Sequence, residues 1–337
     1  MAGNVLYIRT DMNEKIATGH MMRCLSVADS AKARGADCIF ITADDSARNL
    51  IAKRGYDNIV LGTEYDDMES ELDWLIPLIM ERKIDRLLVD SYSVTENYFY
   101  KLGEHLDVYY IDDLNSFPYP VKGVINYSNY AHDDFYHVRY PGTKYYLGCG
   151  YAPLREAFKN PEPKNIARNV KNVLLMSGGS DPYGIIPQIL EKIPEGKYET
   201  LNVICGNYNT RLSEIKEKFG NRKELHVYSK VERIWQLYAE ADIAISAGGS
   251  TLYELASMGV PTITYSFSDN QIHNVRSFDL DELMPCAGDV RGGNVPSRVA
   301  YFLDRLENMD ERIEKSRRLQ RLVDGKGADR LADVVLN

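Results

Sequence analysis

The sequence predicts an α/β protein made of two doubly wound, Rossmann-like domains. Short apolar runs, each suited to one buried strand, alternate with segments of helical periodicity along most of the 337 residues. Such alternation is typical of a parallel sheet covered by helices on both faces. A chain of this length exceeds one ordinary core, and the alternation is interrupted once near its middle. We therefore expect two domains.

The first half begins with the apolar run 5–8 and contains seven predicted strands. They cover residues 5–8, 38–42, 58–61, 86–90, 107–112, 121–126 and 144–148. Helical spacing predicts helices over 22–33, 47–54 and 68–83. Gly55 is a natural C-cap for the second helix, and Pro77 is expected to kink or interrupt the third.

Residues 159–172 separate the two halves. They contain two prolines and several charges without apolar periodicity, which predicts a linker. Alternation then restarts, with strands expected at 173–176, 200–205, 225–228, 243–246 and, last in the core, 262–265. Helices are expected at 183–191, 209–219, 231–240 and 251–258, and one long amphipathic helix at the end. The predicted domains are 1–158 and 173–310, with a helix in 311–337 packing back on the N-terminal domain.

Composition narrows the class of protein. The net charge is −9 and no basic run of five residues occurs, which argues against a nucleic-acid partner. No apolar stretch approaches the ~20 residues of a membrane span, and no signal peptide is visible. Five scattered cysteines fit reduced thiols better than disulfides or a zinc site. We expect a soluble, cytoplasmic protein without a membrane span.

The first candidate site is the stretch Thr18-Gly19-His20, between the first strand and its helix. Ligands of open α/β sheets bind at such carboxyl ends of strands. Gly19 permits close approach of the backbone, the helix N-terminus attracts anions, and His20 supplies a side chain of the type that serves as acid or base in catalysis. Asp11, on the same loop, could orient His20 or bind sugar hydroxyls; the alternative is an Asx turn. Asp90 ends another strand, where functional carboxylates gather.

Further charged residues are candidates in this half. Arg23 and Arg155 are the cations most suited to a ligand cleft, although an isolated Arg23 more commonly pairs on a helix surface. Asp112 and Asp113 end a strand and could hold a metal ion, but no third ligand has suitable spacing. We therefore expect no metal and no cofactor.

The second half has a glycine-rich turn after its first strand, at Ser177-Gly178-Gly179. Tandem glycines expose backbone N–H groups, which suits a phosphate or a close approach between domains. The alternative is a tight strand-to-helix turn. In that interpretation Asp181 or Ser180 is the N-cap and Pro182 the first helical residue.

A second turn, Gly248-Gly249-Ser250-Thr251, supplies N–H and hydroxyl donors before a predicted helix, which suits a phosphate. Glu254 follows it. Its spacing favours a capping box with Ser250 or Thr251, and its functional interpretation is a carboxylate that binds a ribose diol. The polar stretch 266–273, after the last predicted strand, either lines the same cleft or forms a solvated loop.

Together these segments resemble the UDP-2,4-diacetamido-2,4,6-trideoxy-β-L-altropyranose hydrolases of pseudaminic acid biosynthesis. That family is related to GT-B glycosyltransferases and to proteins of spore-coat polysaccharide synthesis. The resemblance runs nearly end to end and rests on the motifs at 9–11, 18–24, 151–156, 177–181, 246–254, 269–271 and 324–328. The turn at 246–254 is shared with many UDP-sugar glycosyltransferases. Ala17 departs from the glycine common in the family.

The resemblance implies a GT-B fold, two Rossmann-like domains facing each other across a cleft, with UDP held mainly by the C-terminal domain. His20 would be the general base that activates water at the anomeric carbon, releasing UDP with inversion, and Asp11 could hold its tautomer. Glu254 would bind the ribose. The implied nucleotide contacts also include Val231 for uracil and Gly249, Ser250 and Thr251, beside Gly248, for the diphosphate.

Sugar positioning is implied for Arg155 and Asn270. The wider set of expected substrate residues adds Asp11, Thr18, Gly19, Arg23, Asp90, Ser177, Gly178, Gly179, Asp181 and Gln271. The expected partner is a small UDP-sugar. The alternatives are a glycosyltransferase that passes the sugar to an acceptor and a non-catalytic nucleotide-sugar-binding protein.

Overall fold

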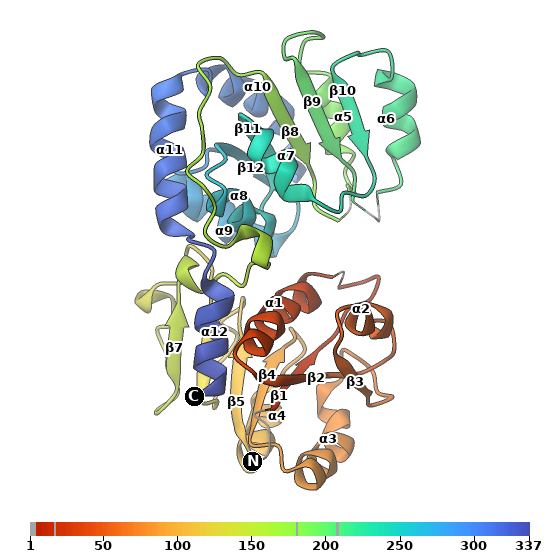
Figure 1. Cartoon of the computed structure of the whole chain (residues 1–337), viewed down its shortest axis with the longest axis vertical. Helices are drawn as coiled ribbons and strands as arrows, with labels where there is room; N and C mark the ends of the chain where they lie inside the picture. Colours follow the sequence, from red (N-terminus) through yellow and green to blue (C-terminus); the bar gives the residue numbers. More distant parts are fainter. Residues whose placement is uncertain (1–4, 17, 180, 207–208) are drawn as a thin grey trace. The chain divides into compact units, whose positions relative to one another are not determined.

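A computed structural model describes residues 5–16, 18–179, 181–206 and 209–337. The chain forms two compact units (Figure 1). Unit 1 comprises Met1–Glu156 together with Lys326–Asn337, and unit 2 comprises Ala157–Gly325. The departure from glycine noted at Ala17 and the capping alternative at Ser180 lie outside the described residues.

The described part of unit 1 contains a seven-stranded parallel sheet of order β3-β2-β1-β4-β5-β6-β7. Its strands are β1 (Val5–Thr10), β2 (Asp37–Thr42), β3 (Asp57–Val60), β4 (Arg86–Asp90), β5 (Asp107–Ile111), β6 (Gly123–Asn126) and β7 (Lys144–Leu147). The order reverses between β1 and β4, which are direct neighbours. Ligands of doubly wound sheets bind at such a switch point.

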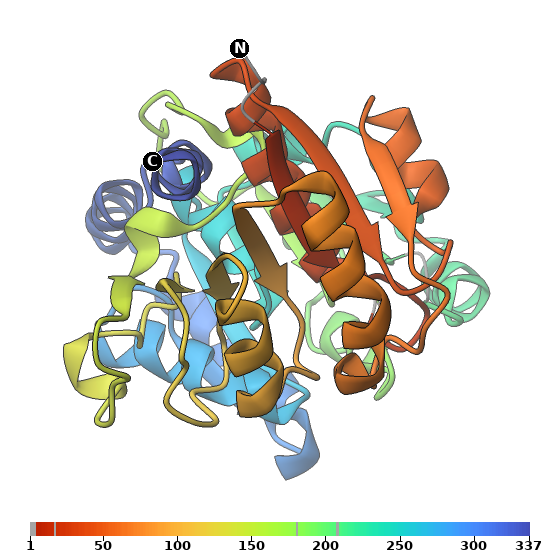
Figure 2. The same cartoon turned by 90° about the horizontal axis from the view of Figure 1, so that it is seen from below.

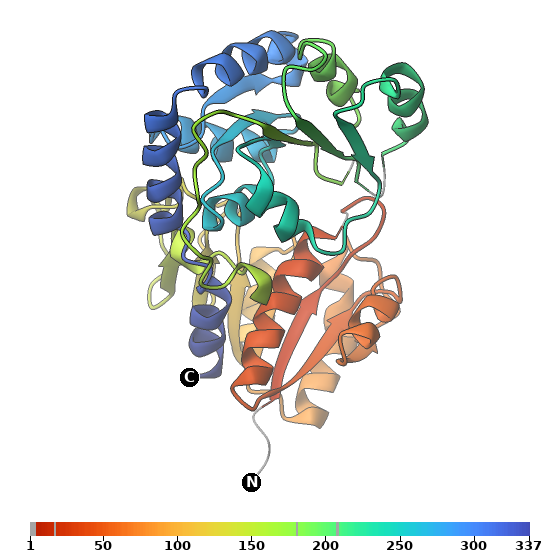
Figure 3. The same cartoon turned by 45° about the horizontal axis from the view of Figure 1, so that its top comes forward.

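Helices cover both faces of this sheet. Figure 3 shows α1 (Gly19–Ala33) and α12 (Gly327–Leu336) in front of it, and α3 (Met68–Arg82) and α4 (Glu96–Gly103) behind. In Figure 2, which is seen from below, α3 and α4 lie in front of the sheet. The short α2 (Arg48–Lys53) follows β2. The expectation that Pro77 would interrupt α3 is wrong, because the helix runs through it, and α4 was not predicted.

The chain end differs from the single helix expected over 311–337. Two helices form there, α11 (Met309–Leu322) in unit 2 and α12 in unit 1. Gly325 separates them at φ +74°, where a side chain would also overlap the carbonyl of Phe158. Helix α12 packs against α1 within unit 1, where Arg34 pairs with Asp329 and Asp333.

Unit 2 contains, within the described ranges, a six-stranded parallel sheet of order β10-β9-β8-β11-β12-β13. Its strands are β8 (Asn172–Met176), β9 (Thr200–Ile204), β10 (Leu225–Tyr228), β11 (Ile243–Ala247), β12 (Thr262–Ser266) and β13 (Cys286–Asp289). The prediction that the strand at 262–265 is the last was wrong, because β13 follows it. Residues 159–171 form no helix or strand.

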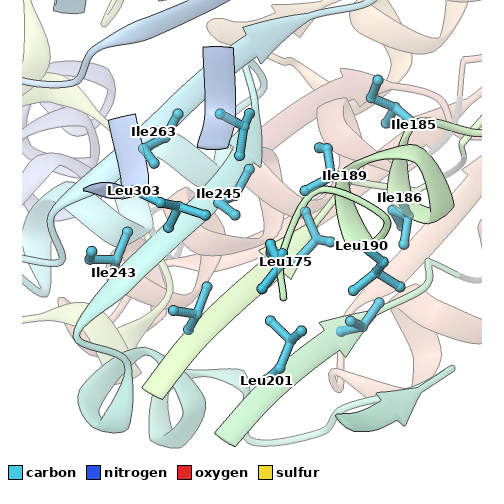
Figure 4. Close-up of a cluster of buried hydrophobic side chains, with 14 of the residues drawn as sticks. Leu175, Ile185, Ile186, Ile189, Leu190, Leu201, Ile243, Ile245, Ile263 and Leu303 are labelled. Carbon is cyan, nitrogen blue, oxygen red and sulfur yellow. The ribbon is translucent and has the colours of Figure 1, made fainter. Parts of the chain in front are cut away.

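The helices of unit 2 are α5 (Ile185–Leu190), α6 (Leu212–Phe219), α7 (Ile234–Glu240), α8 (Thr251–Ser257), α9 (Asp269–Leu280), α10 (Val295–Arg305) and α11. One core cluster joins the sheet to α5, α6 and α10. Figure 4 shows Leu175, Ile245 and Ile263 of the strands gathered with Ile189 of α5 and Leu303 of α10. The predicted α/β class with two doubly wound units is confirmed.

No described helix combines the length and the apolar character needed to cross a bilayer.

Candidate active site

His20 lies at the switch point of the unit 1 sheet. Helix α1 begins at Gly19, so His20 occupies its first turn, directly after the loop that leaves β1. Strand β4 runs beside β1 with Thr10 in register with Asp90. The carboxyl ends of β1 and β4 and the N-terminus of α1 therefore meet around His20.

His20 and Asp90 form a buried pair. Nδ1 of His20 lies 2.6 Å from Oδ1 of Asp90, and only 7% of His20 is exposed. Nη2 of Arg23 is also near Nδ1, at 3.2 Å. A proton on Nδ1 is required, because two lone pairs cannot face each other at 2.6 Å. In the neutral imidazole Nε2 then carries the lone pair, and none of the described residues bonds to Nε2.

Arg23 keeps Asp90 ionised. Its Nε and Nη2 each lie 2.6 Å from a different oxygen of Asp90, which makes the pair bidentate. Burial alone would raise the pKa of Asp90, but the charges of Arg23 and His20 outweigh it and hold that pKa well below its usual range. Asp90 is thus a fixed negative charge that can stabilise an imidazolium at His20. Arg23 is buried in this pair rather than paired on the helix surface.

Three residues of this network were not predicted in these roles. Asp113 accepts from Nη1 of Arg23 at 2.8 Å and from the Tyr92 hydroxyl at 2.8 Å, and Tyr127 lies 2.9 Å from the same Nη1. The Tyr92 ring packs edge-on against His20 at 4.5 Å. The only sequence signal was their position just after β4, β5 and β6.

A pocket of about 250 Å³, including space open to solvent, lies beside this pair. Its lining is mainly aromatic and hydroxylic and comes from the end of β4, the start of α1 and the loops that follow β1, β3 and β4. It consists of Asp11, Ile16, His20, Tyr65, Asp90, Ser91, Tyr92 and Ser93. Such a lining suits a sugar, whose ring packs on aromatic faces and whose substituents bond hydroxyls.

Asp11 lines the pocket but does not orient His20. Its Oδ2 lies 2.5 Å from Nη1 of Arg9, and its Oδ1 accepts from the Ala43 amide at 2.8 Å. Arg9 is fully buried and is also paired with Glu71. The expected tautomer-holding role of Asp11 therefore falls to Asp90. The Asx-turn alternative is not seen either; Asn13 makes that turn, accepting from the amides of Lys15 and Ile16.

Thr18 and Gly19 form the start of α1. Thr18 is the N-cap residue, whose carbonyl accepts from Met22 N but whose side chain makes no capping bond. Gly19 is exposed, and a Cβ added there would meet nothing within 4 Å. Packing within unit 1 thus does not require a glycine. Arg155 is half-buried in the loop after β7, outside the set that lines the pocket.

The paired aspartates after β5 serve different partners. Asp112 is buried and accepts from the hydroxyls of Tyr119 and Tyr136, whereas Asp113 accepts from Arg23 and Tyr92. In the described part of the chain, no group of three His, Cys, Asp or Glu side chains could hold a metal ion.

In unit 2, the turn after β8 contains Ser177, which is buried, and Gly178 and Gly179, which are exposed. Gly178 has φ +68°, which favours glycine. Asp181 is buried, and its oxygens accept from the amides of Ile185 and Ile186 at 2.8 and 3.0 Å. Asp181 therefore caps the start of α5 from outside the helix. The expectation of Pro182 as first helical residue is wrong, since α5 begins at Ile185.

The turn after β11 is close-packed at its first glycine. A side chain at Gly248 would overlap Val275 of α9, whereas Gly249 has open space. Ser250 is the N-cap of α8 but makes no side-chain capping bond. Because α8 starts at Thr251, Glu254 falls one position beyond the third helical residue that a capping box uses. Its Oε2 instead accepts from the Tyr238 hydroxyl at 3.1 Å.

The remaining predicted residues lie near these strand ends. Val231 is half-buried in the loop between β10 and α7. The alternative of a solvated loop over 266–273 is wrong from Asp269 onward, because α9 begins there. Asn270 is exposed and bonded to Ser268, and Gln271 accepts from the Phe267 amide through its Oε1. The structure thus gathers His20, Arg23, Asp90 and Asp11 in unit 1 and the glycine turns with Glu254 in unit 2.

Comparison with known proteins gives both a family match and fold neighbours. Residues 157–278 match the family model of glycosyl transferases group 1. The solved structure of MurG from Acinetobacter baumannii aligns over 99% of each chain, with a TM-score of 0.72 at 14% identity. The chain has the GT-B fold. The family match and the GT-B fold together indicate a glycosyltransferase-like enzyme.

Three curated relatives of this GT-B chain differ in length. The spore coat polysaccharide biosynthesis protein SpsG of Bacillus subtilis (strain 168) is 24% identical, covering 94% of this chain and 93% of SpsG. A Helicobacter pylori protein, named pseudaminic acid cytidylyltransferase and UDP-2,4-diacetamido-2,4,6-trideoxy-β-L-altropyranose hydrolase, is 29% identical over 58% of this chain. An uncharacterized protein of Methanocaldococcus jannaschii is 22% identical over 76% of it. The chain spans 36% and 54% of the length of these last two.

Proposed function

We propose that the chain is an inverting nucleotide-sugar hydrolase. Its substrate would be a UDP-linked 2,4-diacetamido-2,4,6-trideoxyhexose, and its products would be UDP and the free sugar for nonulosonic acid synthesis. The observation that carries the proposal is the His20–Asp90 pair, with Nε2 of His20 left without a partner among the described residues beside the pocket that Tyr65 and Tyr92 line. The similarity to the named Helicobacter pylori protein supports this substrate class.

The proposed step needs one base. Nε2 of His20 accepts a proton from water while the water oxygen attacks the anomeric carbon. The bond from that carbon to the diphosphate oxygen breaks, and UDP leaves with the electron pair. Attack opposite the leaving group inverts the anomeric centre. Asp90 stabilises the imidazolium that forms, because it stays ionised and accepts from Nδ1–H.

For the nucleotide we propose the strand ends of unit 2. Gly249, Ser250 and Thr251 would bind the diphosphate, with Gly248 shaping the turn, Glu254 would bind the ribose and Val231 the uracil. The position of these residues after β10 and β11 of a parallel sheet supports the assignment, because ligands of such sheets bind at carboxyl ends.

For the sugar, the proposed contacts are with polar groups near the same strand ends and the His20 loop. They are Asp11, Thr18, Gly19, Arg155, Ser177, Gly178, Gly179, Asn270 and Gln271. Arg23, Asp90 and Asp181 would act indirectly, by fixing the side chains and backbone groups to which they are bonded.

A glycosyltransferase is the second candidate, and the match of residues 157–278 to a glycosyltransferase family model favours it. The same His20 would then deprotonate an acceptor hydroxyl instead of water. Product analysis with and without candidate sugar acceptors separates the two, because only a transferase needs the acceptor for turnover. Binding of UDP without turnover of any UDP-sugar would favour a binding protein.

The direct test is UDP release from the UDP-diacetamido sugar by wild type, His20→Asn and His132→Asn. His132 is an exposed histidine of the same unit and serves as the matched control. The proposal expects release by wild type and His132→Asn and a loss of about 10²–10⁴-fold in His20→Asn. Equal release by His20→Asn would rule out the role given to His20.

A further inference from the structure

The side chains around His20 form a closed ring of contacts. His20 bonds Asp90, Asp90 is paired with Arg23, and Arg23 donates to Asp113. Asp113 accepts from the hydroxyl of Tyr92, whose ring packs back on His20. The ring joins α1 to the loops after β4 and β5. General-base chemistry needs only the contact between His20 and Asp90, so the other contacts of the ring call for an explanation.

We propose that Arg23 and Asp113 are positioning residues that fix the orientation of the His20 imidazole and oppose each other in setting the pH at which it loses its proton. The catalytic meaning of this inference rests on the proposed function. Its electrostatic content rests only on the geometry of unit 1.

Orientation follows from two anchors on one ring. Nδ1 is held by Asp90, and the ring plane is held by the edge-on contact with Tyr92, at an interplanar angle of 80°. Arg23 and Asp113 connect the two anchors, since Arg23 donates to both carboxylates. Loss of the Arg23–Asp90 or the Arg23–Asp113 contact would let Asp90 or Tyr92 move, and the orientation of Nε2 would then be less well fixed.

The charges that face His20 come from several elements. Carboxylates outnumber guanidinium groups among them, so the surroundings tolerate an imidazolium. On α1 these groups are Arg23 and Cys24, and at or just after the end of β4 they are Asp90 and Tyr92. Asp113 follows β5 and Tyr127 follows β6. Asp11 follows β1 and is bonded to Arg9, which is paired with Glu71. Burial raises the pKa values of Cys24, Tyr92 and Tyr127, which keeps these three neutral.

Within this set, Arg23 and Asp113 act with opposite sign. Nη2 of Arg23 lies 3.2 Å from Nδ1 of His20, so its positive charge opposes protonation of the imidazole. Asp113 does not touch the imidazole, but it neutralises part of the charge of Arg23 and so favours protonation. Removal of the Arg23 charge should therefore raise the pH at which His20 loses its proton, and removal of the Asp113 charge should lower it by a smaller amount.

The test is the imidazole titration of His20, followed by NMR in histidine-labelled protein without substrate and assigned with His20→Asn. We expect Arg23→Gln to move the midpoint up by about one pH unit and Asp113→Asn to move it down by a few tenths. Asp133→Asn, an exposed aspartate paired with Arg139, is the control and should leave it unchanged. Unchanged midpoints in both Arg23→Gln and Asp113→Asn would overturn the inference.

A kinetic arm separates positioning from charge. Arg23→Lys keeps the charge but loses the bidentate fork, so we expect a midpoint near that of wild type and a kcat at least tenfold lower with little change in KM. A midpoint shifted as far as in Arg23→Gln would contradict the charge assignment. If Arg23→Gln does not fold, as judged by circular dichroism, Asp113→Asn alone decides: a downward shift supports the inference and no shift overturns it.

The two proposals fail separately. Absence of UDP release by the wild-type protein would contradict the proposed function and leave the NMR result valid. Unmoved midpoints alongside UDP release that depends on His20 would contradict only the role given to Arg23 and Asp113.

Discussion

Nδ1 of His20 lies 2.6 Å from Oδ1 of Asp90, the last residue of the strand beside the one that leads into the His20 loop. Adjacent parallel strands thus supply both members of the pair, one directly and one through the start of α1. Because Asp90 is saturated by Arg23, His20 and Cys24, its charge is fixed before any substrate arrives. Such preorganised charge is what a base that becomes positive requires.

Replacing Asp90 with Asn should lower kcat for UDP release by about 10²–10⁴-fold with little change in KM. The amide can still touch Nδ1 but no longer supplies a negative charge opposite the imidazolium. Asp107→Asn, an exposed aspartate at the start of β5, is the control. A kcat within threefold of wild type in Asp90→Asn would contradict the role of the pair.

Replacing Asp11 with Ala should lower the stability of the folded protein. Its carboxylate balances the buried Arg9 and accepts from the Ala43 amide, so its removal should lower the free energy of unfolding by about 2–4 kcal/mol. Urea titration measures this, with the exposed Asp45→Ala as control. Unchanged stability would contradict the structural role of Asp11 as the partner of Arg9 and Ala43.

The two glycines of the β11 turn should respond differently to alanine. Gly248→Ala places a methyl group on Val275 and should cost about 1–3 kcal/mol of stability, whereas Gly249→Ala meets nothing within 4 Å. Thermal unfolding of both variants checks the difference. Calorimetry with UDP on Gly249→Ala then tests the proposed diphosphate turn on an intact fold. Equal melting temperatures for the two variants would contradict the close packing at Gly248.

Lys164 predicts a pH dependence of stability in unit 2. Its Nζ donates to the carbonyls of Tyr238 and Ala239 at the end of α7, and burial lowers its pKa to about 8. The unfolded chain holds that proton up to a pKa of about 10.4, so the folded state gains stability as pH rises from 8 to 10.

Wild type should therefore gain about 2–3 kcal/mol relative to Lys164→Met across this range, measured by urea unfolding. The exposed Lys192→Met serves as control. A difference that stays flat between pH 8 and pH 10 would show that Lys164 remains charged in the folded protein.

The sequence predicts the position of the site better than the contacts among its side chains. His20 and Asp90 were identified because both follow strands, and carboxyl ends of parallel strands share one edge of a sheet. Asp11 was given the wrong partner although Arg9, two residues before it, lies on the same side of an extended chain. The contact of Tyr92 with Asp113 joins two separate loops, and no local pattern encodes it.

Two of the elements that prediction missed, β13 and α9, have weak apolar signals. Strand β13, Cys286–Asp289, includes a glycine and an aspartate instead of an apolar run. Helix α9 buries Asn274 and Ser277 beside Val275 and Phe278, so its hydrophobic periodicity is diluted. The split between α11 and α12 depends on one left-handed residue, Gly325. Core strands such as β8 and β11 were predicted because burial on both faces makes them continuously apolar.

The central claim, that His20 directs water to the anomeric carbon, is tested most directly by turnover in ¹⁸O-labelled water. With the UDP-diacetamido sugar, mass spectrometry should find the label in the free sugar and none in UDP, and His20→Asn should show neither product above background. Label in the phosphate of UDP would mean attack at phosphorus. Label in the sugar at an equal rate in His20→Asn would mean that another group is the base. Either result would contradict the account.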